Sequence, residues 1–279
     1  MTELFHTADR SRLRQGSGAQ EGPRRIAGLM VAALAVGAAA CSGGSPENAA
    51  PAATTPAPIA NPVDAATAGN VAGRITFEGT PPKPAVVRMD SDPNCVQQGA
   101  TATDETVIVG DGGALQNVFV YVNAGLGNLR FPIPSTPIVL DQRGCRYVPH
   151  VLGAQVGQSV AIVNSDQTLH NVHAIPAANQ EFNMGQPLPG IKHTHQFSTK
   201  EVMVPFKCDV HNWMRAYIGV LDHPYFAVTG ADGGFTLKGL PPGTYTVEAW
   251  HETLGTMTQT VTIGERESKD IAFSFKPSS

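Results

Sequence analysis

Apolar and polar residues alternate along most of the chain from about residue 71 onward, with the period of two that is typical of half-buried β-strands. In residues 117–123, valine alternates with Phe119 and Tyr121 between two asparagines, and short apolar runs follow at 137–141, 157–164 and 201–205. Glycine and proline separate these runs, and no segment of about ten residues or more carries a helical stripe. The pattern therefore predicts an all-β chain built from sandwiches or barrels.

The last part of the chain shows the clearest hairpin. Residues 225–237 contain two strand-like runs joined by an Asp-Gly-Gly turn, which is a strong hairpin signal. Alternating strands are also predicted at 243–249, 258–263 and 271–275. We expect residues 223–279 to form a small antiparallel sandwich, or most of one.

The N-terminal 40 residues have a different character. Residues 1–25 are polar, and residues 26–40 are an apolar run of 15 residues, which is shorter than the ~20 that span a bilayer and typical of a signal peptide. Three alanines precede Cys41, which resembles a bacterial lipoprotein signal and predicts lipidation of Cys41 after cleavage. We therefore expect an exported chain anchored by lipid on the periplasmic side of the envelope. Ser42 favours the outer membrane.

Residues 41–70 are rich in alanine and proline and have no apolar periodicity, so we expect a disordered tether. Without residues 1–40 the chain keeps 14 basic and 20 acidic side chains, a net charge of −6. This balance argues against nucleic acid as a partner. The sequence also lacks nucleophile-elbow, phosphate-loop and His-Glu-x-x-His motifs, so we predict that the protein is not an enzyme.

The four cysteines have separate predicted roles. Cys41 is the expected lipidation site, and Cys208 lies among other candidate metal ligands. Cys95 and Cys145 remain, and two spare cysteines in an exported chain usually pair. We predict a Cys95–Cys145 disulfide.

The strongest chemical signal is a Cys-x2-His-x2-Met stretch that contains Cys208, His211 and Met214. A thiolate, an imidazole and a thioether suit copper better than zinc, magnesium or calcium. A blue-copper site needs a second imidazole, and His170 and His173 are both candidates upstream. The hypothesis is one mononuclear, type 1 (blue) copper site for electron transfer.

These motifs resemble those of the cupredoxins, Greek-key β-sandwiches, and most closely the amicyanin and plastocyanin type, over about residues 131–222. The resemblance implies that His170 rather than His173 is the upstream ligand. It also implies that Asn171 supports the ligands as an outer-shell residue and that Trp213 lies beside a partly exposed His211. The implied ligand set is His170, Cys208, His211 and Met214.

Residues 232–249 resemble a second family, the carboxypeptidase regulatory-like or transthyretin-like β-sandwich with its Ig-like architecture. That family usually begins with a strand similar to residues 73–82. We therefore expect residues 71–130 and 223–279 to form one sandwich with the cupredoxin inserted between them, although two serial domains fit nearly as well. With an insertion, the disulfide would tie host to insert.

The predicted function is that of an exported copper protein which carries single electrons between redox partners in the cell envelope. The expected partner is a c-type cytochrome or a periplasmic oxidoreductase, reached through His211. The alternative is a copper-binding, carbohydrate-binding or structural lipoprotein without redox turnover. His193 and His195 are expected to be solvated rather than to bind metal.

Overall fold

The protein is described by a computed structural model for residues 60–99 and 102–277. The predicted signal peptide, Cys41 and most of the tether lie outside these residues. The described part is all-β except for one short α-helix and one 3-10 turn, so the predicted fold class is confirmed. No helix in residues 60–99 or 102–277 has the length and apolar character needed to cross a bilayer.

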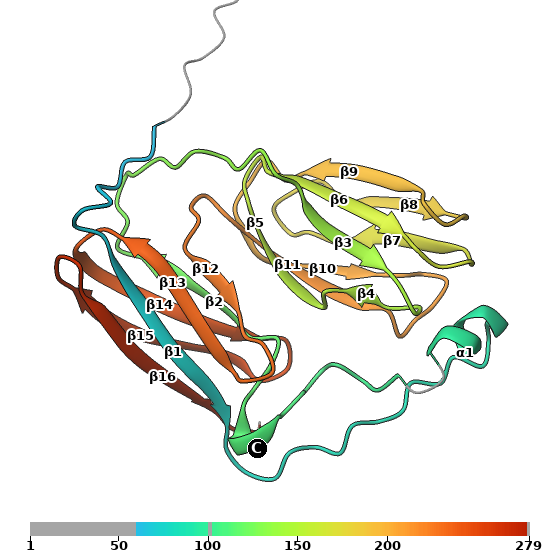
Figure 1. The fold of residues 1–279 in the computed structure, drawn as a ribbon. Helices are drawn as coiled ribbons and strands as arrows, with labels where there is room; N and C mark the ends of the chain where they lie inside the picture. The colour runs from blue at the N-terminus through green and yellow to red at the C-terminus, as the bar shows by residue number, and fades with distance from the viewer. Residues whose placement is uncertain (1–59, 100–101, 278–279) are drawn as a thin grey trace, which may run out of the picture. The chain divides into compact units, whose positions relative to one another are not determined.

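A first sandwich combines strands from both ends of the described chain (Figure 1). One sheet has the order β13-β1-β16 and the other β12-β2-β14-β15. Val71 and Ile75 of β1 and Val247 of β14 point inward from facing sheets and are fully buried. The strands are β1 (Gly69–Phe77), β2 (Phe119–Ala124), β12 (Phe226–Val228), β13 (Gly234–Leu240), β14 (Gly243–His251), β15 (Gly255–Ile263) and β16 (Ser268–Phe275).

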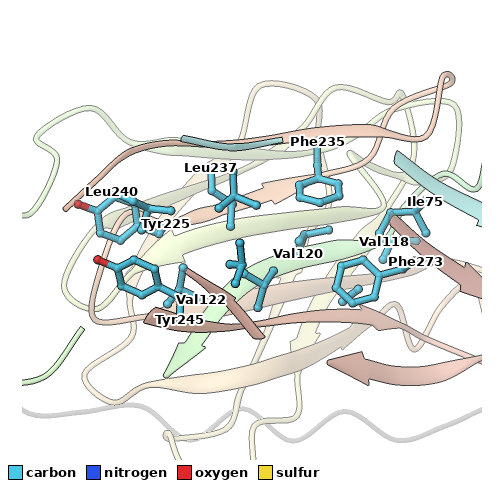
Figure 2. Close-up of a cluster of buried hydrophobic side chains, with 14 of the residues drawn as sticks. Ile75, Val118, Val120, Val122, Tyr225, Phe235, Leu237, Leu240, Tyr245 and Phe273 are labelled. Atoms are coloured by element: carbon cyan, nitrogen blue, oxygen red, sulfur yellow. The ribbon is translucent and has the colours of Figure 1, made fainter. Parts of the chain in front are cut away.

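The core of the first sandwich follows directly from the sequence alternation. In β14, every second side chain from Tyr245 to His251 is buried, as a period of two requires. Figure 2 shows Tyr225 and Tyr245 at one end of this core and Phe273 near the other, with Val120 and Val122 between the sheets. Burial of these apolar side chains is the main force that joins the two sheets.

A second sandwich lies in the sequence between β2 and β12. One sheet has the order β5-β11-β10-β7-β8 and the other β4-β3-β6-β9. Leu140, Ile162, Phe206 and Ile218 are among its buried core residues. The strands are β3 (Ile138–Gln142), β4 (Tyr147–Val148), β5 (Val151–Gln155), β6 (Ser159–Asn164), β7 (His170–Ala174), β8 (Phe182–Gln186), β9 (Lys192–Gln196), β10 (Glu201–Lys207) and β11 (Arg215–Leu221).

Between β1 and β2 the chain leaves the first sandwich, and α1 (Pro93–Gly99) lies at the far end of this excursion (Figure 1). We call residues 85–99 and 102–104 the arm. Its two sides pair, because Val87 N–H donates to Ala102 O at 2.9 Å and Asp104 N–H to Ala85 O at 2.8 Å. The η1 turn (Asp111–Gly113) follows on the way back to β2.

The arm is attached to the second sandwich by a disulfide. Cys95 of α1 bonds to Cys145, which precedes β4, and both residues are fully buried. Met89 of the arm is also buried in the core of the second sandwich. The predicted Cys95–Cys145 disulfide is confirmed.

An aromatic side chain of the first sandwich fits between glycines of the second. Phe119 of β2 is fully buried, and its ring occupies the space beside Gly153 of β5 and Gly219 of β11. A Cβ atom added at Gly219 would lie 2.3 Å from the Phe119 ring and 2.9 Å from Met203 Sδ. Both positions therefore need glycine so that the ring can approach the strands.

We predict that Gly219→Ala destabilises the protein by about 1–3 kcal/mol, because the new methyl group overpacks the Phe119 contact. Gly185→Ala is the matched control, since a Cβ atom at this glycine of β8 meets nothing within 4 Å. Chemical denaturation of both variants measures the difference. Equal free energies of unfolding for the two variants would contradict this account of the packing.

Candidate metal centre

The four predicted ligands come together at one end of the second sandwich. His170 is the first residue of β7, Cys208 directly follows β10, and His211 and Met214 lie in the loop between β10 and β11. All four are buried, with exposed fractions of 0% for His170, 2% for Cys208 and His211, and 1% for Met214. Residues 38 positions or more apart in sequence thus meet in a dry site because β7 and β10 are neighbouring strands.

Three donor atoms converge within this site. Nδ1 of His170 lies 3.0 Å from Nδ1 of His211. Sγ of Cys208 lies 3.8 Å from the same His211 Nδ1 atom. The three ligand atoms all lie within 4.8 Å of one another. Two imidazole nitrogens and a sulfur that face each other in a buried space are a donor set that a soft transition metal satisfies.

The loop that carries three of these residues is closed by its own backbone. Cys208 N–H donates to Met214 O at 3.3 Å, and Met214 N–H donates to His211 O at 3.0 Å. These hydrogen bonds turn the short Cys-x2-His-x2-Met stretch back on itself. The thioether of Met214 is consequently placed in the same buried cluster as the Cys208 sulfur.

Asn171 connects the two ligand-bearing segments. Its backbone N–H points at Cys208 Sγ at 3.5 Å, and its side-chain Oδ1 accepts hydrogen bonds from the N–H groups of Asp209 at 2.6 Å and Val210 at 3.3 Å. Tyr147 adds a second link, because its hydroxyl donates to Asn171 O at 2.7 Å and to Lys207 O at 3.1 Å. The spacing between β7 and the loop is therefore fixed by the protein itself.

The surroundings of Cys208 favour the ionised form of its thiol. Burial raises its pKa, but hydrogen bonds with His170, His211 and the Asn171 N–H outweigh burial and lower the pKa to about 6. The thiolate, which is the form that binds a metal, is thus the favoured species at neutral pH.

Asp166 holds the outer nitrogen of His170. Its carboxylate is fully buried, accepts a hydrogen bond from His170 Nε2 at 2.9 Å, and also accepts the N–H groups of Gly144 at 2.8 Å and Cys145 at 2.7 Å. Burial lowers the pKa of His170, but Asp166 and Cys208 together raise it to about 9. Because Asp166 lies at Nε2, the other ring nitrogen of His170, Nδ1, faces the centre.

Asp92 of the arm holds the outer nitrogen of His211 in the same manner, with Oδ2 3.2 Å from Nε2. Cys95 Sγ lies 3.7 Å from the same nitrogen. Burial raises the pKa of Asp92, but hydrogen bonds from Thr168, the Asn94 N–H and His211 outweigh it and lower the pKa. The expectation that His211 is partly exposed is wrong, because the arm covers this imidazole.

Trp213 lies beside His211 as expected, with the ring centroids 5.0 Å apart. Its Nε1–H donates to Cys145 O at 3.0 Å, so the indole is fixed against the disulfide. Trp213 is only half-buried, in contrast to His211. The aromatic face of the site that reaches solvent is therefore that of Trp213.

The other histidines in residues 60–99 and 102–277 lie outside the cluster. His173 is three residues after His170 in β7, so it faces the opposite side of the strand, where it contacts Asp209 at 2.9 Å and Glu181 at 2.7 Å. His195 packs between the rings of Phe182 and Phe197, with centroids 4.2 Å and 4.7 Å away. Burial lowers the pKa of His195 and the neighbouring His193 lowers it further, which favours a neutral ring.

Two acidic residues of the centre were missed from the sequence. Asp166 has a local signal, because it lies four residues before His170 in the turn that leads to β7. Asp92 has none, because it is 119 residues from His211 and belongs to a segment outside the second sandwich. The five-stranded and four-stranded sheets form a β-sandwich with this cluster at one end.

No protein-family model matches the chain, and no curated protein matches it. Among solved structures, a copper-containing nitrite reductase from Thermus scotoductus SA-01 matches 36% of this chain at 19% identity and a TM-score of 0.30. The chain spans 26% of that enzyme. An amicyanin variant in its Cu(I) form matches 36% of this chain and 97% of its own, at 20% identity and a TM-score of 0.27. A purple cupredoxin from Nitrosopumilus maritimus matches 31% of this chain and 99% of its own, at 24% identity and a TM-score of 0.26.

We predict that the metal-free protein shows an ultraviolet thiolate absorption that is present above pH ~6 and is lost as the pH falls through about 6. The absorption falls because protonation converts the Cys208 thiolate to the thiol. A pH titration of the difference spectrum against Cys208→Ser isolates this group from any other cysteine. A midpoint near 8.5, the value of an ordinary thiol, would contradict the stabilisation described above.

Proposed function

We propose that this chain is a type 1 copper protein that carries single electrons between redox proteins. The observation that supports it is the convergence of two imidazole Nδ1 atoms and the Cys208 sulfur in a buried site, with Met214 in the same cluster. Thiolate and thioether ligands favour copper over the harder metals, and a His2Cys set with a weak Met ligand is typical of electron-transfer copper. A copper ion held there supplies reversible one-electron chemistry between Cu(II) and Cu(I).

The chain's own residues hold the ligands in place in either oxidation state. His170 is fixed from behind by Asp166, and Cys208 is fixed by the Asn171 N–H. The ligand loop is closed by backbone hydrogen bonds between Cys208 and Met214. Ligands restrained in this way have little freedom to rearrange, which is the property that fast electron exchange requires.

The route for electrons in this proposal passes through Trp213 rather than through an exposed His211. His211 is 2% exposed, whereas Trp213 is half-buried and its ring lies 5.0 Å from the His211 ring. The indole therefore offers a short path from a buried ligand to the surface. A redox protein such as a c-type cytochrome or a periplasmic oxidoreductase would dock there through the small interface typical of transient redox encounters.

The cellular setting remains that predicted from the sequence. We infer that the protein is exported and is anchored on the periplasmic side of the envelope, with the outer membrane favoured, through lipid on Cys41. The proposed role is that of a carrier rather than an enzyme. The first sandwich would act as a carboxypeptidase regulatory-like accessory domain that supports the copper domain.

We predict that copper-loaded protein has an intense visible thiolate-to-copper absorption, a type 1 EPR spectrum and a reversible reduction potential. Cys208→Ser should lose the visible band and bind copper more weakly, because it removes the thiolate. His173→Gln is the control, since this imidazole lies on the other face of β7 and should leave the spectrum unchanged. A colourless wild-type protein, with copper affinity unchanged in Cys208→Ser, would instead favour copper binding without electron transfer.

We also predict that Trp213→Ala slows electron self-exchange several-fold while the visible spectrum is retained, because the ring that connects His211 to the surface is removed. Trp250→Ala serves as the control, because it changes the only other tryptophan, which lies in β14 of the first sandwich. Exchange rates come from NMR line broadening in mixtures of oxidised and reduced protein. Equal rates for the two variants would exclude Trp213 as the route.

A further inference from the structure

The segment that covers His211 does not belong to the sandwich that carries the ligands. The arm leaves the first sandwich after β1 and returns to it before β2 (Figure 1). Its contacts with the second sandwich include the Cys95–Cys145 disulfide, the buried Met89 side chain, and Asp92.

Hydrogen bonds from the protein alone hold the carboxylate of Asp92 in a fixed position. Asp92 precedes α1, its Oδ1 accepts the Asn94 N–H at 2.8 Å, and its carbonyl accepts the Val96 N–H at 3.0 Å, as in a helix N-cap. The Thr168 hydroxyl donates to Oδ2 at 2.6 Å. The same Oδ2 then faces His211 Nε2 at 3.2 Å. The first turn of α1, the Thr168 hydroxyl and the His211 imidazole therefore all hold the Asp92 carboxylate in the same position.

We propose that Asp92 is a positioning residue for His211, and that the disulfide-anchored arm is a lid that closes this side of the centre. The inference rests on the proposed copper site. When Asp92 accepts the Nε2 proton, the tautomer with a free Nδ1 is selected, and Nδ1 is the atom that faces His170 and Cys208. The lid also keeps solvent and small ligands away from the imidazole.

The negative charge of Asp92 has a second consequence. Together with Asp166, it puts a carboxylate behind each of the two imidazoles, and the Asp92 side chain is only 16% exposed. Negative charge near the centre favours the more positive oxidation state of a bound metal. Asp92 thereby lowers the reduction potential, and its hydrogen bond slows loss of the metal.

The test compares Asp92→Ala and Asp92→Asn with Asp90→Ala and Asp90→Asn in the full chain loaded with copper. Asp90 is the matched control, because it lies two residues away, carries the same charge, and pairs at the surface with Arg88. Asp92→Ala should release copper to a chelator at least ~10-fold faster, the usual effect of losing an outer-shell partner. Asp92→Asn, which keeps an oxygen acceptor but not the charge, should raise the reduction potential. The Asp90 variants should change neither quantity.

A measurement on the metal-free protein separates this inference from the copper proposal. The His211 Nε2 proton, followed by nitrogen-15 NMR, should exchange slowly with water in the wild type and in Asp90→Ala, and faster in Asp92→Ala. If the wild type shows slow exchange and yet binds no copper, the copper proposal fails while the role of Asp92 stands. If Asp92→Ala and Asp90→Ala match in both exchange and copper release, the positioning role is wrong.

The lid is tested by replacing the disulfide, with Cys95→Ala and Cys145→Ala combined. This change removes the covalent link between α1 and the second sandwich and replaces neither Asp92 nor any of the four ligands. Copper release and azide binding should both become faster than in the wild type. Unchanged rates in a folded double variant would show that the arm does not close the centre.

Discussion

The centre depends on the hydrogen bonds that satisfy the outer nitrogens of two buried imidazoles. A buried polar group without a partner costs about 1–3 kcal/mol, and two imidazoles turned toward one point each leave an Nε2 atom facing the protein interior. Asp166 and Asp92 accept those two protons. Each carboxylate is in turn held by other donors, from Gly144 and Cys145 in one case and from Thr168 and Asn94 in the other.

The fold class and the ligand cluster could be predicted because their signals are local. Alternation with a period of two depends only on neighbouring residues, and it matches the burial of every second side chain from Tyr245 to His251 in β14. Cys208, His211 and Met214 lie within seven residues, so their spacing alone predicted a shared loop. The disulfide followed from counting cysteines in an exported chain, and needed no geometry.

The burial of His211 could not be predicted from the sequence because its cause is distant in the chain. Nothing around residues 206–214 indicates that α1 lies over the loop, and nothing around residues 85–99 indicates a metal. The arm has little apolar periodicity; Met89 and Cys95 are buried in the core, and Val87 and Ala102 pack against it. Its position is determined by a few long-range contacts, which local patterns do not encode.

The path of the arm also determines which part of the chain can be separated as a unit that contains the complete metal centre. A fragment cut to residues 138–221 would contain every strand of the second sandwich and all four ligands. It would nevertheless leave Cys145 without its bonding partner and His211 without its carboxylate, because both come from a stretch that precedes β2. The module that can be excised, transplanted or expressed alone is therefore larger than the sandwich that bears the ligands, and its natural boundary lies before residue 85.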